Sequence, residues 1–417
     1  MRAVFLITLV AFGSFAQGRF DRFNARTSQG RSTRGFEQSN YAFFEFAPAS
    51  GAGMGTACAC TTPTGAKGET LTATRAGEAR CFRQGFATTG ILAGDVVTCT
   101  ANQSRIVPNP SSVLGYWREA GVTNVATRSE ALDNAGWVKE AGVTITADSA
   151  ACPTAPDNTA TADLVTFAGL SNTGVYQPNS TPNNSTVTHS VFVARRTSGG
   201  AACTLTLTDG YTALAGTSFA VPAAGAGWTR VIDAAAVTVG LTSGNYLKEV
   251  TAGDCTDVCV WGMQNEVASF ASSYIPTVAA GVARSADSAM SVTLATGIGP
   301  SFCAAGSASW PSSLVTTGII AQLGTAAPDL ASIGRNTNTA ASFVINATTT
   351  TPAVSAIGTS TARAYLADAS GTRSAFWNAG SVAAPAASMT GASTAFSFGA
   401  LDAITTAVQV DPSRCTP

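Results

Sequence analysis

Few residues of this chain have the types and spacing that catalysis requires. His189 is the only histidine, and it stands at the start of an expected strand, between Thr188 and Ser190. Hydrolytic triads usually take their general base from histidine. A histidine in such a place is more often a surface or core residue than a base. We therefore expect no nucleophile activated by histidine.

Carboxylates suggest a second kind of chemistry, the hydrolysis of glycosidic bonds. Glu249, Asp254, Asp257 and Glu266 cluster in the sequence, and glycosidases need two carboxyl groups that face each other across a cleft. Nothing in the sequence places two of them face to face. We expect Asp254 to Asp257 to form a turn and Glu266 to be structural. The chain is therefore predicted not to be an enzyme, and a glycoside-active enzyme is the last of three hypotheses.

Cysteines could bind a metal ion or form disulfides. Their number is even, and they lie at positions Cys58, Cys60, Cys81, Cys99, Cys152, Cys203, Cys255, Cys259, Cys303 and Cys415. No CxxC pair exists, and the two closest spacings lack the second ligand pair of a zinc site. We predict disulfides, which persist outside the cytosol, and neither a metal site nor a cofactor. A structural Ca²⁺ ion is compatible with a β-sandwich, but no EF-hand-like string supports it.

Aromatic side chains are the best candidates for binding, because the apolar faces of sugars stack on aromatic rings. Tyr176, Tyr211 and Tyr246 are flanked by Gly, Asn and Pro residues that are typical of loops. Trp137 and Trp261 are expected to pack in a core instead. We therefore predict the three tyrosines as ligand contacts.

The composition favours a protein with several cores. The 417 residues are 45% hydrophobic and only 11% charged, against roughly 25% charged in typical globular proteins. The length predicts two or three domains. A formal net charge of -1 gives no general attraction to nucleic acid or anionic lipid. One local exception, the arginine-rich segment 17–40, is expected to be a solvated basic linker, with an electrostatic docking arm as the alternative.

The N-terminus has the pattern of a secretory signal. Met1 and Arg2 precede the apolar run Ala3 to Phe12, and Ser14 to Ala16 supply small residues at the cleavage site. We expect residues 1–16 to be a signal peptide. The apolar run is too short for an ordinary membrane-spanning helix. No later segment is long and apolar enough to span a membrane either, so we expect a secreted, extracellular protein.

Short strands separated by turn residues fill the rest of the chain. Cys203 to Thr208 alternates with period two, and Val258 to Met263 is apolar on both faces, which predicts a central buried strand. The other expected strands are Tyr41–Phe46, Thr70–Arg75, Ala79–Arg83, Asp95–Thr100, Val187–Val193, Thr229–Val239, Ser342–Asn346, Ala362–Ala367 and Ser374–Asn378. No convincing amphipathic helix is visible. This pattern predicts an all-β chain with a jelly-roll or sandwich architecture.

Breaks in composition divide the expected strands into three regions. A small Cys-rich β region is expected at 41–112, a jelly roll at 113–291 and a second β-sandwich at 292–417. Cys303 lies near the beginning of the last region and Cys415 near its end. Because the first and last strands of a sandwich are often neighbours, we predict a Cys303–Cys415 disulfide.

Several motifs of the middle region resemble a module of bacteriophage tail and head-fibre (spike) proteins. The matching stretches are Asn124–Glu130 (NVATRSE), Leu132–Trp137 (LDNAGW), Trp261–Glu266 (WGMQNE), Phe270–Pro276 (FASSYIP) and Arg284–Asp287 (RSAD). Weaker upstream matches are Thr72–Glu78, Arg105–Ile106 and Gly115–Thr123. The resemblance covers roughly 70–290. It implies a jelly roll of the carbohydrate-binding-module type, followed by a concanavalin-like or laminin-G-like sandwich at 292–417.

Three functional hypotheses follow. The first is a non-catalytic adhesion or display protein directed at a cell-surface glycan, together with other fibre or surface subunits. The second is a purely structural fibre or coat component without a ligand, and the third is the enzyme considered above. Phage fibres assemble in the cytoplasm, without a secretory signal and rarely with ten cysteines. A secreted bacterial protein that shares the module is therefore the alternative to a protein of the virion surface.

Overall fold

The computed structural model describes most of the chain beyond residue 41. The described ranges are 42–45, 58–61, 71–82, 88–108, 114–167, 171–178, 186–197, 202–208, 216–238, 244–252, 255–298, 302–310, 318–325, 330–337, 340–354, 361–369, 372–378, 380–390, 393–400 and 403–411. The expected signal peptide, the basic linker, Tyr211, Asp254 and Cys415 lie outside them. All regular elements within these ranges are β-strands, so none is a helix that could cross a membrane.

Two antiparallel sheets form a jelly-roll sandwich in the middle of the chain. The first sheet has the order β15 (Thr229–Thr238), β12 (Thr186–Arg195), β17 (Val258–Glu266), β10 (Asp163–Phe167) and β9 (Val143–Thr146), and β7 (Val122–Asn124) joins β17 to β18 (Val282–Arg284). The second sheet has the order β14 (Thr217–Ala220), β13 (Thr204–Thr208), β16 (Asn245–Glu249), β11 (Gly174–Gln177) and β8 (Val138–Lys139). The predicted all-β class and jelly roll are confirmed.

Period-two patterning decides which side chains enter the core between these two sheets. Leu205 and Leu207 of β13 are fully buried in it, as the alternation of apolar and polar residues predicts. Strand β17 lies between β12 and β10, and all nine of its residues are buried. Its Val260 faces the jelly-roll core, whereas its Trp261 belongs to a second core on the other face of the sheet. The prediction of a central strand buried on both faces is confirmed.

A second sandwich contains most of the C-terminal strands. One of its sheets has the order β2 (Ala59–Thr61), β5 (Ser104–Pro108), β6 (Leu114–Arg118), β29 (Ala403–Asp411), β20 (Phe302–Ser309), β25 (Thr361–Ala369), β26 (Thr372–Trp377) and β27 (Gly380–Val382), with β1 (Ala42–Glu45) on β29. The other has the order β19 (Met290–Ile298), β28 (Ser393–Phe398), β21 (Gly318–Leu323), β22 (Ala331–Thr337), β23 (Ala340–Ile345) and β24 (Thr348–Thr350). Leu71, Ile106 and Tyr116 from the N-terminal part are buried in the core of this sandwich.

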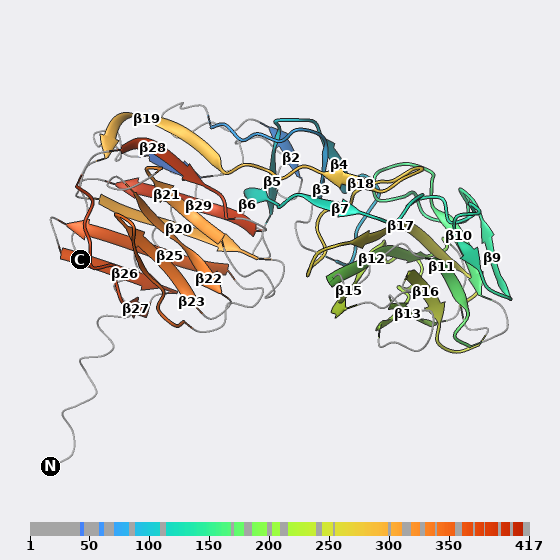
Figure 1. Cartoon of the computed structure of the whole chain (residues 1–417). Coiled ribbons are helices and arrows are strands. Elements are labelled where there is room, and N and C mark those ends of the chain that lie inside the picture. The colour runs from blue at the N-terminus through green and yellow to red at the C-terminus, as the bar shows by residue number, and fades with distance from the viewer. Residues whose placement is uncertain are drawn as a thin grey trace, which may run out of the picture.

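The N-terminal strands lie between the two sandwiches (Figure 1). Strand β6 pairs with β29, so a sheet that begins in the expected region 41–112 continues into the expected C-terminal sandwich. The hairpin of β3 (Ala79–Phe82) and β4 (Val96–Cys99) covers the outer face of the first jelly-roll sheet. There Phe82 stacks on Phe192 with ring centroids 6.0 Å apart. That face of the jelly roll is therefore closed to a ligand.

One expected strand is absent because its residues do not form a continuous ladder of backbone hydrogen bonds. Residues 70–75 were predicted as a strand, but only Thr72 forms a bridge, to Ser291. The backbone N–H of Thr74 donates to Ser288 Oγ at 2.8 Å, and that of Arg75 donates to Asn102 Oδ1 at 3.1 Å. Side-chain acceptors thus alternate with separate backbone hydrogen bonds, such as the pair between Thr72 and Ser291, and no continuous ladder forms.

Disulfides connect neighbouring strands and loops in both halves of the described chain. The bonds are Cys58–Cys81, Cys60–Cys99, Cys152–Cys259 and Cys203–Cys255. Three sulfur atoms, those of Cys58, Cys81 and Cys99, lie within 4.8 Å of one another, yet each of them belongs to a disulfide. The prediction that the cysteines form disulfides is confirmed for these eight residues.

We expect Cys303 and Cys415 to be bonded as well. Cys303 lies on β20 opposite Asp411 of β29, and Asp411 precedes Cys415 by four positions in the sequence. Cys303 is disulfide-bonded. Replacing both cysteines with Ser should lower the free energy of unfolding by about 2–4 kcal/mol, the usual effect of a native disulfide that closes a long loop. Chemical denaturation measures the change. Peptide mapping that paired either cysteine elsewhere would contradict the prediction.

Candidate functional site

Two of the three predicted tyrosines are direct neighbours in the second jelly-roll sheet. Tyr176 lies in β11 and Tyr246 in β16, and they are Cα partners in this antiparallel pair. The prediction that they lie in loops is wrong, because a four-residue strand such as β11 is held by the strands on both sides of it, β16 and β8. Tyr211, the third candidate, is not among the described residues, and its role stays a prediction.

Strand alternation directs both tyrosines away from the core. Their neighbours Val175 and Leu247 point into the jelly-roll interior, so Tyr176 and Tyr246 project from the opposite, outer face. Thr208 of β13 is the next residue in the same row, paired with Tyr246. The two rings meet edge to face, with centroids 5.4 Å apart and an interplanar angle of 73°. This is a preferred geometry for an aromatic pair.

The two rings differ in exposure. Tyr246 is only 2% exposed, and its hydroxyl donates to the Glu140 carboxylate and to the carbonyl of Asn172, the latter at 3.0 Å. The ring of Tyr246 therefore cannot stack on a sugar in this conformation, which contradicts its predicted role as a ligand contact. Tyr176 is partly exposed. The structure thus makes Tyr176 the accessible ring and Tyr246 its support.

Polar side chains continue this outer face beside the tyrosines. Lys248 and Thr206 are Cα partners in the adjacent row, and the Lys248 ammonium lies 5.8 Å from the centroid of the Tyr246 ring. Thr206 and Ser218 share a hydrogen bond of 2.8 Å between their hydroxyls. Lys248 and Thr206 are largely buried, so this face offers a polyhydroxylated ligand the ring of Tyr176 and the exposed hydroxyl of Ser218. Glu140 adds a carboxylate there, and it already accepts hydrogen bonds from Tyr246 and from the backbone of Gly174.

Three of the four carboxylates considered for glycoside hydrolysis lie among the described residues and have structural partners. Glu249 is buried and accepts a hydrogen bond of 2.8 Å from the backbone N–H of Cys255. Glu266 is also buried and accepts from the backbone and hydroxyl of Ser272, and burial raises the pKa of its carboxyl group. Asp257 forms a partly exposed ion pair with Arg196 at 3.1 Å. The structural role expected for Glu266 agrees with these contacts.

His189 is a core residue. Its side chain is 1% exposed, and burial lowers the pKa of its imidazole to about 3. The ring is therefore neutral at physiological pH, and it is enclosed rather than presented to a substrate. The expectation that it is not a catalytic base agrees with this burial.

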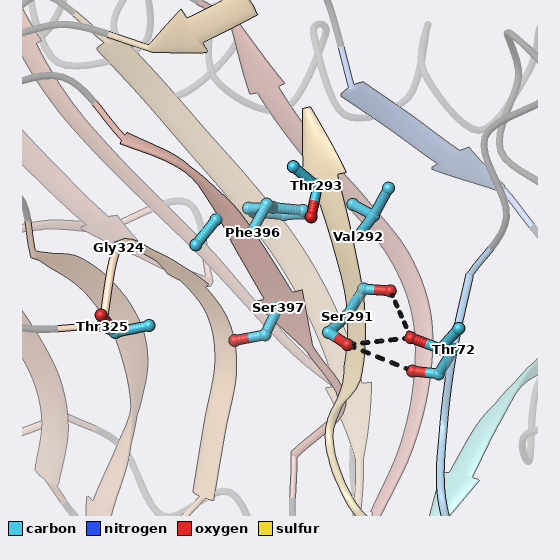
Figure 2. A pocket seen from close by; sticks show the side chains of 9 residues that line it. Thr72, Ser291, Val292, Thr293, Gly324, Thr325, Phe396 and Ser397 are labelled. Atoms are coloured by element: carbon cyan, nitrogen blue, oxygen red, sulfur yellow. Dashed lines mark hydrogen bonds between the residues drawn. The ribbon is translucent and has the colours of Figure 1, made fainter. Parts of the chain in front are cut away.

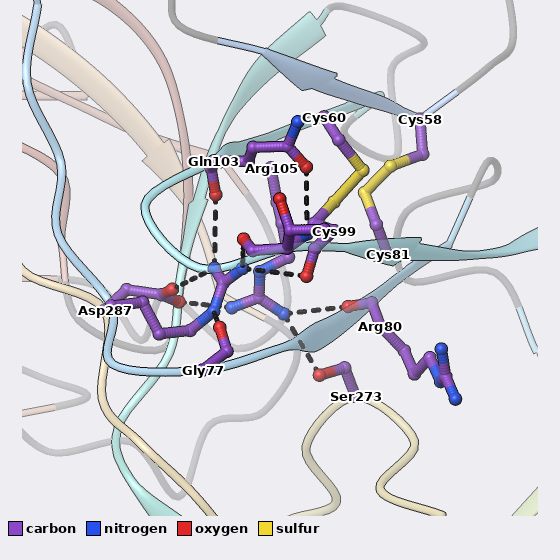
Figure 3. The surroundings of a disulfide bond; sticks show 12 residues. Cys58, Cys60, Gly77, Arg80, Cys81, Cys99, Gln103, Arg105, Ser273 and Asp287 are labelled. Carbon is purple, nitrogen blue, oxygen red and sulfur yellow. Dashed lines mark hydrogen bonds and ion pairs between the residues drawn. A yellow bond between two sulfur atoms is a disulfide. The ribbon is translucent and has the colours of Figure 1, made fainter.

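Charged residues of the resemblance motifs meet in a buried network between the two sandwiches. Figure 3 shows two of them, Arg105 and Asp287. Arg75 Nη1 lies 2.8 Å from Asp287 Oδ1. Arg105 pairs with both Asp287 and Glu119, and Arg284 pairs with Glu119. All five side chains are at most 4% exposed. We call these five residues the junction network.

Hydrogen bonds complete the junction network. The backbone N–H of Ser273 donates to Glu119 Oε1 at 2.7 Å, and its hydroxyl lies 2.6 Å from Glu119 Oε2. Burial alone would raise the pKa of Glu119, but the guanidinium groups of Arg284 and Arg105 lower it to about 2. The carboxyl group of Glu119 is therefore ionised at physiological pH. Its role is to hold the segments before and after the jelly roll together, which sequence reasoning did not anticipate.

A groove lies on the second sandwich, where the N-terminal segment crosses β19 (Figure 2). Its volume is about 480 Å³. The lining residues are Thr72, Ser291, Val292, Thr293, Gly324, Thr325, Ala395, Phe396 and Ser397. None of them is charged. Serine and threonine occur throughout this chain, so no sequence signal distinguished these positions.

Comparison with known proteins shows distant structural likeness only. No family model matches the chain, and no curated protein sequence matches it. The N-terminal CBM22-1-CBM22-2 tandem domain of Paenibacillus barcinonensis Xyn10C is similar at 12% identity and a TM-score of 0.27, over 71% of this chain and 99% of that one. Domains LG4-5 of the mouse laminin alpha1 chain are similar at 12% identity and a TM-score of 0.22, over 64% of this chain and 84% of that one.

Proposed function

We propose that this protein is a non-catalytic adhesion or display protein that binds a glycan on the outer face of its second jelly-roll sheet. The observation that carries the proposal is the partly exposed ring of Tyr176, held edge to face by the buried ring of Tyr246. A ring fixed in this way loses little conformational entropy when a ligand stacks on it. Ser218, the Cα partner of Thr206 on the same face, is exposed, and its hydroxyl can donate to or accept from a sugar.

Binding at a single site should be weak. A stacked ring contributes about 0.5–1.5 kcal/mol beyond area burial, and each hydrogen bond adds ~0.5–1.5 kcal/mol net. After the entropy cost of association, this corresponds to dissociation constants of roughly millimolar to micromolar. Effective adhesion then requires several copies of the protein, because multivalency multiplies weak affinities. Other fibre or surface subunits would supply that multiplicity.

An extracellular location agrees with this function. Four disulfides connect the described residues, and disulfides persist in oxidising compartments. The signal-like N-terminus favours secretion. The resemblance of the motifs to phage fibre proteins favours the virion surface as the alternative, and the tyrosine face is proposed to act in the same way in either place.

The proposal predicts that Tyr176→Ala weakens glycan binding by roughly 5- to 30-fold, since it removes about 1–2 kcal/mol of stacking and buried area. Tyr176→Phe keeps the ring and is the matched control, which should retain most of the affinity. A glycan array with the oligomerised full-length protein identifies the ligand, and calorimetry measures both variants.

A reducing-sugar assay on the same ligand tests the absence of catalysis. Release of sugar that grows with time would establish an enzyme and refute the proposal. Equal affinity of Tyr176→Ala and wild type would place the site elsewhere. A folded protein that binds no glycan on the array would favour the purely structural fibre or coat component.

A further inference from the structure

The groove on the second sandwich has walls from two distant parts of the chain. Ser291 and Thr293 of β19 and Ser397 of β28 project from the outer face of their sheet, where Ser291 and Ser397 are Cα partners. Thr72 closes one side. Its backbone exchanges two hydrogen bonds with Ser291, of 3.0 and 2.8 Å, and its hydroxyl lies 3.1 Å from that of Ser291 (Figure 2). The side wall is therefore fixed in place.

The lining determines which ligand the groove can accept. Five of its residues carry hydroxyl groups, and each hydroxyl can both donate and accept a hydrogen bond. Val292 and Phe396 alternate with them, and their side chains are buried in the core of the sandwich. Because no lining side chain is charged, nothing there compensates the desolvation of an ionic ligand. The volume of about 480 Å³ is within the usual range of small-molecule sites.

A break in strand pairing lies at one end of the groove. The register between β19 and β28 passes from Thr293 opposite Ala395 directly to Ile298 opposite Ser393. Four residues of β19, 294–297, are thus set against one residue of β28. Such bulges locally interrupt the ladder and often lie beside binding sites. Here the bulge bends β19 next to the hydroxyl-lined surface.

We propose that this groove is a second binding site, specific for a neutral saccharide. Hydroxyls on the walls can donate hydrogen bonds to the hydroxyls of the sugar and accept hydrogen bonds from them. The site is independent of the tyrosine face, since the two lie in different sandwiches. A saccharide bound there contacts both Thr72 and β19, so it links the N-terminal segment to the C-terminal sandwich.

The test uses the full-length protein and a panel of neutral oligosaccharides of glucose, xylose, mannose and N-acetylglucosamine, with oligogalacturonate as an anionic comparison. Saturation-transfer NMR identifies bound sugars, and titration measures their affinity. Ser397→Trp fills the groove and should weaken the binding of at least one neutral sugar by roughly tenfold or more. Thr349→Trp is the matched control. Thr349 is exposed in β24 on the same face of the same sheet, outside the groove, and its variant should bind as wild type does.

Tyr176→Ala separates this proposal from the first. Binding that survives Tyr176→Ala and is lost in Ser397→Trp supports the groove. If Tyr176→Ala removes all neutral-sugar binding, the groove proposal is overturned and the tyrosine site stands. If the groove variants affect only oligogalacturonate, the proposed ligand class is wrong. Thr293→Trp, at an exposed lining position, repeats the test if thermal melting shows that Ser397→Trp does not fold, and unchanged sugar binding in the folded variant overturns the proposal.

Discussion

Asp287→Asn should lower the free energy of unfolding by about 3–5 kcal/mol. The carboxylate of Asp287 is paired with both Arg75 and Arg105, and also accepts a hydrogen bond of 2.9 Å from the backbone N–H of Glu119. Arg105 and Arg284 would keep their ion pairs with Glu119, whereas Arg75 would lose the ion pair with Asp287. Removing one partner of a buried ion pair is strongly destabilising, because it leaves uncompensated charge in a medium of low dielectric.

A surface ion pair provides the control for this variant. Asp257→Asn breaks the pair with Arg196, whose side chain is 39% exposed, and such pairs contribute at most about 1 kcal/mol. Urea denaturation of both variants, followed by intrinsic fluorescence, measures the difference. High salt should change the stability of Asp287→Asn little relative to wild type, since buried pairs are poorly screened. A loss below 1 kcal/mol for Asp287→Asn would show that the junction network does not hold the two sandwiches together.

Some strands of this protein are predictable from the sequence because one or both of their faces are buried. Leu205 and Leu207 alternate with threonines, so the sequence alone indicates both the strand β13 and its inner face. Strand β17 was equally visible, because both of its faces lie against cores. Tyr176 was misplaced for the opposite reason. Its strand has four residues, and Asn172 and Pro178 on either side of it are typical of turns.

The sequence does not predict in the same way which strands pair with each other or which charged residues form ion pairs. Strand β6 was not among the expected strands, and its pairing with β29 joins residues almost three hundred positions apart. Arg75 and Asp287 are separated by 212 positions, and no local pattern relates them. The resemblance motifs did single out the segments of the junction network. Their charges were not expected to meet, because motif matching along a sequence carries no distances.

The second large effect that we expect is acid destabilisation through His189. Burial lowers the pKa of this imidazole to about 3, whereas the unfolded chain has the ordinary value of about 6.5. Neither ring nitrogen has a hydrogen-bond partner within the part of the chain that the structure describes. The folded protein therefore keeps His189 neutral while the unfolded chain binds a proton.

The sign of the effect follows from proton linkage. Below pH 6.5 the unfolded state binds more protons than the folded state, so the free energy of unfolding falls as the pH falls. Above pH 6.5, His189 contributes fully to the free energy of unfolding. This contribution is about 2 kcal/mol smaller at pH 5 and about 4–5 kcal/mol smaller at pH 3, and it changes little at still lower pH. Asp163 acts in the opposite direction. Burial raises the pKa of its carboxyl group to about 6, which stabilises the fold as the pH falls toward 4.

A variant without a titratable group at position 189 isolates the contribution of the histidine to the pH dependence of stability when it is compared with wild type. His189→Gln is neutral at every pH, and its neighbours across the sheet, Asp233 of β15 and Asn265 of β17, stay in both proteins. Urea denaturation between pH 7.5 and 4.5 should show that wild type loses about 2 kcal/mol more than His189→Gln by pH 5. His189→Leu should show the same pH dependence as His189→Gln, whatever its stability at pH 7.5. Parallel pH profiles of wild type and both variants would mean that His189 accepts a proton in the folded state.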